Sequence, residues 1–141
     1  MITALATNVL LDLFLADPTF GEAAKRAIKN ARQDGSLVIC EIVYAELSPL
    51  HPTQEALDEK LRILGILLEP AGREACFTAG HTFLRYRRRQ TGRPRILPDF
   101  LIGAHALHHA DALLTRDRGF YRCYFKELRI IDPLNGRATG E

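Results

Sequence analysis

The sequence has few cysteines, and their positions do not suit a disulfide framework or a zinc site. Only three occur among 141 residues, at positions 40, 76 and 123, and none belongs to a CxxC pair. An odd number of widely spaced thiols is typical of reduced cysteines in a cytosolic protein. We therefore predict a cytoplasmic location.

Long apolar runs and the common nucleotide-binding and hydrolase motifs are also absent. No uninterrupted hydrophobic segment approaches the ~20 residues that a membrane span needs. The first residues lack the basic region and the cleavage site of a signal peptide. The sequence contains no GxGxxG, GxxxxGKS or GxSxG pattern, so it offers no signature of dinucleotide binding, a P-loop or a serine hydrolase. We expect no membrane association.

The net charge of +2 conceals one strongly basic segment. Residues 85–95, RYRRRQTGRPR, contain six arginines and no acidic residue. Without these six, 13 basic residues remain against 17 acidic ones, so the rest of the chain is mildly acidic. A local basic run of this kind is a candidate contact for phosphate groups.

Strand-like apolar segments alternate with amphipathic segments along the whole chain. Strands are predicted over residues 2–6, 37–40, 112–115 and 128–132, and residues 66–70 could add a short one. Helices are predicted after Asn8, from Pro18 to Gly35, and over 41–48, 54–67, 72–90 and 98–110. The alternation predicts one α/β domain over residues 1–141, with a parallel sheet, helices on both faces and a loose tail at about 134–141.

Two of these helices carry more specific expectations. Asn8 is expected to cap the first helix through its side chain. In the helix over 72–90, the spacing predicts that Phe77, Ala79 and Leu84 face the interior.

Acidic side chains follow the predicted strand ends or lie on the helices beside them. Glu46 is on the helix after the second strand, Asp99 is in the first turn of its helix, and Asp117 lies just beyond the strand at 112–115. Because parallel α/β sheets bind ligands at the carboxyl ends of their strands, these carboxylates could converge there. Carboxylate oxygens suit magnesium or manganese, and such a cation can activate water and stabilise the leaving oxygen of a phosphodiester.

Each of these carboxylates also has an ordinary interpretation. The helix dipole alone favours Asp99 at a helix N-terminus. Glu46 could be a solvated helix residue, and Asp117 could cap the turn that follows it. Only their joint placement beside strand ends favours a metal site, and the spacing alone leaves the convergence open.

Four segments resemble the PIN-domain family, and within it the VapC-type toxins of bacterial toxin–antitoxin pairs. They are ATNVLLDLF at 6–14, EIVYAEL at 41–47, PDFLIGAHAL at 98–107 and ALLTRDRGF at 112–120, in the order of the family. The resemblance implies a PIN-like three-layer α/β/α sandwich with a central, mostly parallel sheet. It also implies an endoribonuclease, a hydrolase that depends on magnesium or manganese.

The resemblance implies roles for individual residues. Three of the family's four acidic metal ligands fall on Glu46, Asp99 and Asp117. Two supporting polar positions of the same pocket fall on Asn8 and Thr115.

Position 6 departs from the family pattern. Family members have Asp-Thr-Asn where this chain has Ala6, Thr7 and Asn8, and a methyl group cannot ligate a metal. Ala6 is either an engineered substitution that silences a toxic nuclease or the mark of a naturally degenerate member. In both cases we expect this chain to be impaired as a nuclease. Ala6 also favours the alternative function, a catalytically dead PIN-like protein that binds RNA or a partner.

The basic segment has two interpretations. It could be the solvated end of a long helix, where the dipole favours positive charge. Alternatively, it guides RNA phosphates toward the acidic pocket. In that case Arg85, Arg88 and Arg89 share one helix face, and Arg87 points away from it.

Three histidines lie on the helix over 98–110. His105 and His109 have the i, i+4 spacing of a metal-chelating pair, but no HExxH motif and no nearby cysteine or acid completes a zinc set. We interpret these two residues and His108 as packing or surface residues.

Apolar side chains near 41–68 suggest a partner surface. They could form a homodimer face or a groove for an antitoxin segment, or they could belong to the core. The resemblance to VapC-type toxins implies a homodimer, an RNA substrate and a VapB-type antitoxin that blocks the site.

Overall fold

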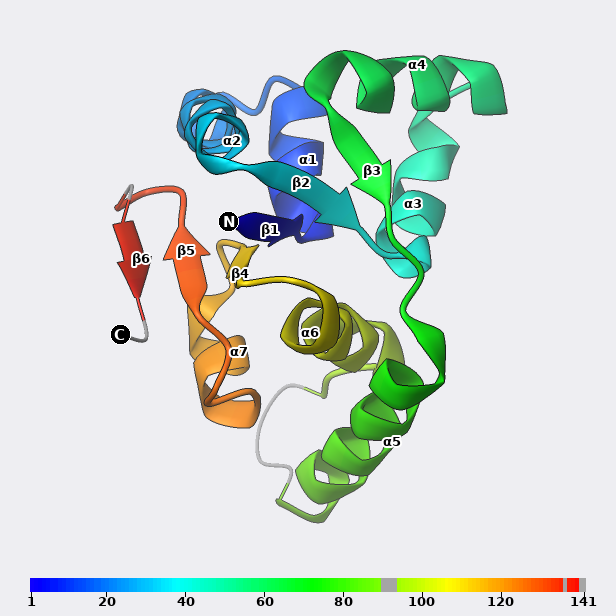
Figure 1. The fold of residues 1–141 in the computed structure, drawn as a ribbon, viewed down its shortest axis with the longest axis vertical. Helices are drawn as coiled ribbons and strands as arrows, with labels where there is room; N and C mark the ends of the chain where they lie inside the picture. Colours follow the sequence, from blue (N-terminus) through cyan, green and yellow to red (C-terminus); the bar gives the residue numbers. More distant parts are fainter. Residues whose placement is uncertain (90–93, 136, 140–141) are drawn as a thin grey trace.

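A six-stranded sheet forms the centre of the computed structural model, which describes residues 1–89, 94–135 and 137–139 (Figure 1). The strands are β1 Ile2–Leu5, β2 Ser36–Ile39, β3 Ile66–Leu68, β4 Ala112–Leu114, β5 Ile130–Asp132 and β6 Arg137–Thr139. Their order across the sheet is β3-β2-β1-β4-β5-β6. The pairs from β3 to β5 are parallel, and β6 runs antiparallel to β5.

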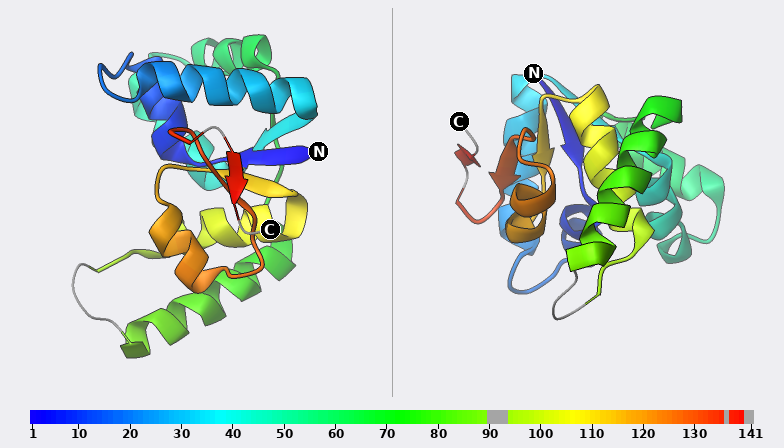
Figure 2. Two further views of the ribbon diagram at one scale, coloured as in Figure 1. Left: turned by 90° about the vertical axis from the view of Figure 1, so that its left-hand side faces the viewer. Right: turned by 90° about the horizontal axis from the view of Figure 1, so that it is seen from below.

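Helices cover both faces of this sheet. They are α1 Thr7–Phe14, α2 Gly21–Asp34, α3 Glu41–Leu47, α4 Gln54–Leu64, α5 Gly72–Arg89, α6 Leu97–His109 and α7 Arg118–Tyr124, with a short 3₁₀ helix at Ser48–Leu50. Figure 1 shows α1 and α2 above the sheet and α5, α6 and α7 below it, and Figure 2 shows the same layers from two other sides. The expected three-layer α/β/α sandwich with a mostly parallel sheet is therefore confirmed. No helix in the described part of the chain is long and apolar enough to cross a membrane.

Helix α6 is the innermost helix, because its sequence has almost no polar face. Phe100, Ile102, Ala104 and Ala106 are all buried in it. The small residues among them let α5 pack along its outer side and the sheet along its inner side. Asp99 begins this helix, so its position is fixed by the packing of the core.

Two expectations about individual helices are wrong. Phe77 and Leu84 are 68% and 41% exposed on α5, because Ala75, Ala79 and Thr82 form the face that packs on α6. This buried face is made of small residues, so the large apolar side chains misled the assignment. Only Ala79 faces inward as expected.

Asn8 does not cap the first helix. Ala6 is the N-cap residue of α1, and no side chain bonds to the free N–H groups there. The Asn8 side chain is used elsewhere, in a contact with Thr115 described below. Residues 137–139, which belong to the segment expected to be a loose tail, pair with β5 as strand β6.

A glycine in α6 allows close helix packing, and this leads to a stability prediction. A Cβ atom built at Gly103 would lie 2.5 Å from the Phe125 ring, whereas one built at Gly80 in α5 would meet nothing within 4 Å. Gly103→Ala is expected to lower the free energy of unfolding by about 1–3 kcal/mol, because Phe125 must move. Gly80→Ala is the matched control and should raise it by about 0.5–1 kcal/mol through helix propensity. Chemical denaturation measures both, and equal effects would contradict the packing argument.

Candidate functional site

The candidate site lies where the strand order reverses. β2 and β4 flank β1 on opposite sides, so the connections after β1 and after β4 lead to opposite faces of the sheet. Such a switch point leaves a crevice at the carboxyl ends of the strands, where open α/β sheets bind ligands. In this chain Ala6 follows β1, and Thr115, Arg116 and Asp117 follow β4.

Asp99 occupies one wall of the crevice, in the first turn of α6. Phe100, the next residue, is fully buried and packs against the rings of Phe83, Tyr86 and Phe120 at 5.1–5.2 Å between centroids. The Tyr121 hydroxyl donates a hydrogen bond to the Asp99 carbonyl over 3.3 Å. These contacts fix the start of α6, so the Asp99 carboxylate is presented from a rigid support.

The environment of Asp99 shows that the predicted carboxylates are neighbours. Burial raises the pKa of Asp99 above its usual range, and the negative charges of Asp117 and Glu46 raise it further. These carboxylates come from α6, from the turn after β4 and from α3, so the fold brings together residues that are far apart in sequence. A pocket of about 450 Å³ between Pro94, Arg95 and Ile96 on one side and Asp117 on the other includes Asp99.

Glu46 projects from the last turn of α3 and is held by the residue after Ala6. The Thr7 hydroxyl donates a hydrogen bond to the Glu46 Oε1 atom over 2.6 Å. This contact ties α3 to the start of α1. The sequence pattern alone assigns no role to Thr7.

Asn8 and Thr115 hold the turn that carries Asp117. The Asn8 side-chain Nδ2 donates to the Thr115 hydroxyl over 3.2 Å, and the Asn8 Oδ1 accepts the Arg116 backbone N–H over 3.2 Å. The Thr115 hydroxyl also accepts the backbone N–H of Asp117 over 3.0 Å. The structure thus places both residues beside the acidic pocket, where they shape the backbone that presents Asp117.

Arg95 is a site residue that the sequence analysis did not single out. Its guanidinium donates two hydrogen bonds to the Asp117 carboxylate, one of them through Nη2 over 3.3 Å. The same group lies 4.6 Å from the centroid of the Phe120 ring. Arg95 therefore supplies a positive charge inside the acidic pocket. It belongs to the basic run, but nothing in its spacing distinguishes it from the other arginines.

A second ion pair lies beside the pocket and was also not predicted. Asp12 on α1 is 5% exposed and accepts hydrogen bonds from Arg116 at 2.6 Å and 3.2 Å. Arg116 stacks over the Phe20 ring at 4.1 Å. This pairing directs the Arg116 side chain toward α1.

Ala6 is 2% exposed and stands at the end of β1, with its backbone N–H bonded to the Leu114 carbonyl over 3.0 Å. Its extended backbone and N-cap position on α1 suit aspartate, a favoured N-cap residue. The missing acid therefore lies at a position where the backbone accepts one.

The donor chemistry of the pocket fits a hard divalent cation, but the arrangement of the side chains does not yet form a metal site. Glu46, Asp99 and Asp117 offer carboxylate oxygens, the ligands that magnesium and manganese prefer. Within residues 1–89, 94–135 and 137–139, no three His, Cys, Asp or Glu side chains lie close enough to hold an ion. Arg95 on Asp117 and Ala6 at the end of β1 are the two features that separate this pocket from a carboxylate cage.

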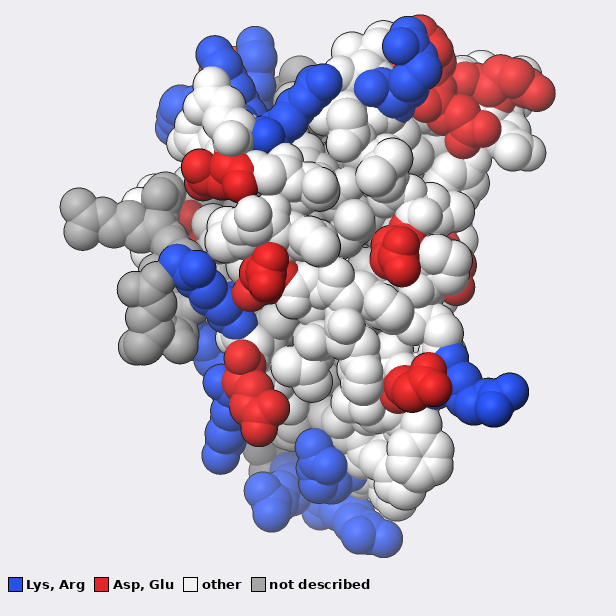
Figure 3. Space-filling view, in the orientation of Figure 1, with Lys and Arg blue, Asp and Glu red and all other residues white. Residues whose placement is uncertain are grey.

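The arginines of α5 lie toward the C-terminal end of the helix. Figure 3 shows a cluster of basic side chains, in blue, at the bottom of the molecule, where this helix ends. Arg85 and Arg89 line a groove between α5 and the end of α7. Arg87 lies on another side, with its guanidinium 5.8 Å from the Phe83 ring centroid. Arg88 is exposed. The part of the basic run at residues 90–93 lies outside the described residues.

The histidines of α6 are engaged in packing contacts. His105 is 1% exposed, and burial lowers its pKa. The His105 and His109 rings lie 5.3 Å apart, and His109 Nε2 contacts the Ala71 carbonyl oxygen. His108 shares a hydrogen bond with Thr78 over 2.8 Å. His105 is buried, His109 is half-buried and His108 is exposed, in agreement with their interpretation as packing or surface residues.

Solved structures share this fold across most of the chain. A chain of the VapBC2 complex from Rickettsia felis, bound to a promoter DNA fragment, matches with a TM-score of 0.70 and 21% identity, covering 94% of this chain and 98% of that one. VapBC-1 from nontypeable Haemophilus influenzae matches with a TM-score of 0.70 and 22% identity, covering 95% and 99%. The sarcin-ricin loop cleaving toxin VapC20 from Mycobacterium tuberculosis matches with a TM-score of 0.57 and 15% identity, covering 79% and 86%.

Sequence comparison gives the family. None of the curated proteins matches the chain. The model of the PIN domain, however, matches residues 4–126, from the first strand to the end of α7 and including every carboxylate of the pocket. This chain belongs to the PIN domain family.

Proposed function

We propose that this protein is the endoribonuclease toxin of a VapBC-type toxin–antitoxin pair, with a divalent metal as cofactor and with activity impaired by Ala6. The observation that supports the proposal is the shared pocket of Asp99 and Asp117, with Glu46 near enough for its charge to act on Asp99. These acids come from three separate segments, and burial together with the negative charges of Asp117 and Glu46 raises the pKa of Asp99. Crowded carboxylates of this kind are stabilised by a cation.

Each pocket residue has a role in this proposal. Asp99, Glu46 and Asp117 would hold magnesium or manganese, and Asn8 and Thr115 keep the turn of Asp117 in place. When bound, the cation supplies an activated water and neutralises charge at the phosphoryl group. The N-termini of α1 and α6 begin at this edge of the sheet, and their dipoles favour a bound phosphate.

The structural relatives support the assignment to this group of toxins. Several are toxin–antitoxin complexes, and VapC20 is described as cleaving the sarcin-ricin loop. By the same resemblance, we propose RNA as the substrate, a cytoplasmic location, and phosphate contacts through Arg85, Arg88 and Arg89.

We also propose a VapB-type antitoxin and a second copy of this chain as partners. Ile63, Leu67 and Leu68 are 58%, 63% and 47% exposed on α4 and the edge strand β3. A hollow of about 280 Å³ between α3 and the start of α4 is lined in part by Tyr44, His51 and Leu57. Exposed apolar side chains on neighbouring elements are typical of protein interfaces.

A catalytically dead protein that binds RNA or a partner remains the second candidate. Two observations favour it, the methyl group of Ala6 where an acid is expected and the ion pair of Arg95 with Asp117. Both lower the affinity of the pocket for a cation.

The test that separates the two candidates is RNA cleavage by the Ala6→Asp chain, purified without antitoxin. Cleavage with magnesium or manganese that EDTA abolishes supports the nuclease. A folded Ala6→Asp chain that cuts no RNA with either metal would contradict it.

Arg95 leads to a separate prediction about metal affinity. In the Ala6→Asp background, Arg95→Gln is expected to tighten manganese binding about fivefold, because the guanidinium no longer competes for Asp117. This corresponds to about 1 kcal/mol, the upper end for a partly exposed ion pair. Isothermal titration calorimetry measures the affinity.

Arg118→Gln is the matched control for that experiment. Arg118 carries the same charge one residue beyond Asp117, but it pairs with Asp132 at 3.3 Å. An equal gain in both variants would show that general charge, rather than the contact with Asp117, limits metal binding. If Arg95→Gln leaves the affinity for manganese unchanged, Arg95 does not compete with the cation for Asp117.

A further inference from the structure

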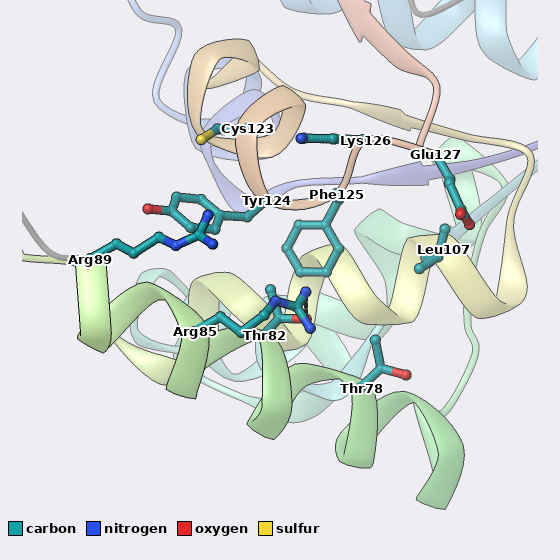
Figure 4. Close-up of a pocket in the computed structure, with 10 residues that line it drawn as sticks. All are labelled: Thr78, Thr82, Arg85, Arg89, Leu107, Cys123, Tyr124, Phe125, Lys126 and Glu127. Carbon is teal, nitrogen blue, oxygen red and sulfur yellow. Dashed lines mark hydrogen bonds between the residues drawn. The ribbon is translucent and has the colours of Figure 1, made fainter.

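A groove of about 530 Å³ lies on the lower face of the molecule, separate from the acidic pocket (Figure 4). One wall is the side of α5 that carries Thr82, Arg85 and Arg89, and the other is the end of α7 with the residues that follow it. Leu107 of α6 lies between the two walls. Figure 4 shows the side chains of Arg85 and Arg89 directed from α5 into this space.

The groove combines apolar side chains with three cations and one carboxylate, Glu127. Arg85 and Arg89 stand one helical turn apart on α5, and Lys126 lies on the opposite wall. All three side chains are exposed, and none forms an ion pair with any residue that the structure describes. Arg85 donates to the buried Thr82 hydroxyl over 3.4 Å, which holds its guanidinium along the groove. Three unpaired cations around one hollow fit an anionic ligand.

The groove and the acidic pocket share one aromatic cluster. Tyr124 lines the groove and packs edge-on against Tyr86 at 5.4 Å and against Phe100 at 6.0 Å. Tyr86 accepts a hydrogen bond from the backbone N–H of Arg95, and Phe100 adjoins Asp99. The end of the groove at Arg89 and Tyr124 therefore borders the elements that build the pocket.

We propose that this groove binds the sugar–phosphate backbone of single-stranded RNA, with Arg85, Arg89 and Lys126 on phosphates and Tyr124 against a base. The inference rests on RNA being the substrate of the acidic pocket, and it assigns the path by which the strand reaches that pocket. The guanidinium group of arginine and the ammonium group of lysine neutralise phosphates, and the tyrosine ring can stack on an unpaired base. An acidic peptide could use the cations but would gain nothing from the aromatic ring.

The experiment measures RNA binding by the chain as it stands, without divalent metal, so that no cleavage interferes. The probe is a short fluorescent single-stranded oligoribonucleotide, followed by anisotropy over a range of salt concentrations. The variant Arg85→Gln/Arg89→Gln/Lys126→Gln is expected to bind at least about tenfold more weakly. Its log–log salt slope should fall by about 2, since each lost phosphate contact on a single strand removes ~0.7.

The matched control removes the same charge from the other face of the sheet. Lys25, Arg26 and Lys29 are exposed on α2, and the variant Lys25→Gln/Arg26→Gln/Lys29→Gln should keep the affinity and slope of the parent. Arg85→Lys/Arg89→Lys keeps the charge and should keep the slope. Thermal melting verifies that each variant is folded.

Three results would overturn the proposal. The first is an unchanged affinity and slope in the groove variant, and the second is an equal loss in the α2 variant. The third is a groove variant that binds RNA as well as the parent chain does but no longer binds an oligoglutamate peptide that the parent binds. This result would assign the groove to an acidic protein partner. Failure of the nuclease function is a different result, since the Ala6→Asp chain would then bind RNA through the groove without cutting it.

Discussion

Ala6→Asp is expected to raise magnesium-dependent RNA cleavage about 100-fold or more above the level of the parent chain. Position 6 directly follows β1 at the switch point, beside the turn that presents Asp117. A carboxylate there adds the fourth negative charge and strengthens the hold on a cation that generates the nucleophile. Gel assays of RNA with magnesium, manganese or EDTA measure the gain. Expression of the Ala6→Asp chain in a bacterial host without antitoxin should inhibit growth.

The local structure indicates that the protein tolerates this substitution. Ala6 has an extended backbone at the N-cap of α1, and aspartate in that position can bond the free N–H groups of the first turn. Such a cap contributes about 0.5–2 kcal/mol to stability, which offsets part of the repulsion from the neighbouring acids. The fold should therefore survive, and manganese should raise the melting temperature of Ala6→Asp more than that of the parent.

Ala6→Asn is the control that isolates charge from shape. Asparagine has the size and capping ability of aspartate but no negative charge. It should stabilise α1 without restoring cleavage. If the asparagine variant cleaves RNA as well as the aspartate variant, a metal ligand at position 6 is not what the chain lacks.

The convergence of the acids was predictable because it follows from topology. Strand–helix alternation indicates a parallel sheet, and a parallel sheet collects residues after its strands at one edge. Asp117 meets this condition directly, and Asp99 meets it because its helix starts at the same edge. The pattern alone could not show that Glu46 reaches them, since it lies in the last turn of α3, where the Thr7 hydroxyl holds it.

The cations of the site were less predictable, because their partners are chosen by tertiary packing. Arg95 pairs with an acid 22 residues away, and Arg116 pairs with Asp12 over 104 residues. Neither separation corresponds to a helix or strand period, so no local sequence pattern predicts these two ion pairs. The same reason explains Phe77, whose exposure depends on α5 using its small residues against α6. The sequence pattern therefore predicted Asp99 and Asp117, which line one pocket, but not the cations beside them.

In the Ala6→Asp background, Asp99→Asn and Asp117→Asn are each expected to lower cleavage about 100-fold or more while the fold remains intact. Both changes remove a negative charge from the cation site and replace it with a weaker ligand. Gel assays with magnesium and manganese measure the loss. Asp34→Asn, at the exposed end of α2, removes the same charge away from the pocket and should leave the rate unchanged.

Stability distinguishes this loss from unfolding, and the sign follows from the pKa of Asp99. Because burial and the neighbouring carboxylates raise this pKa, the folded protein disfavours the charged form relative to the unfolded chain. Removing the charge at neutral pH should therefore leave the melting temperature of the metal-free protein unchanged or raise it. Manganese should stabilise Asp99→Asn less than it stabilises the Ala6→Asp parent. A variant that keeps both full cleavage and full stabilisation by manganese would eliminate Asp99 as a ligand, and the pocket would then need another residue to hold the cation.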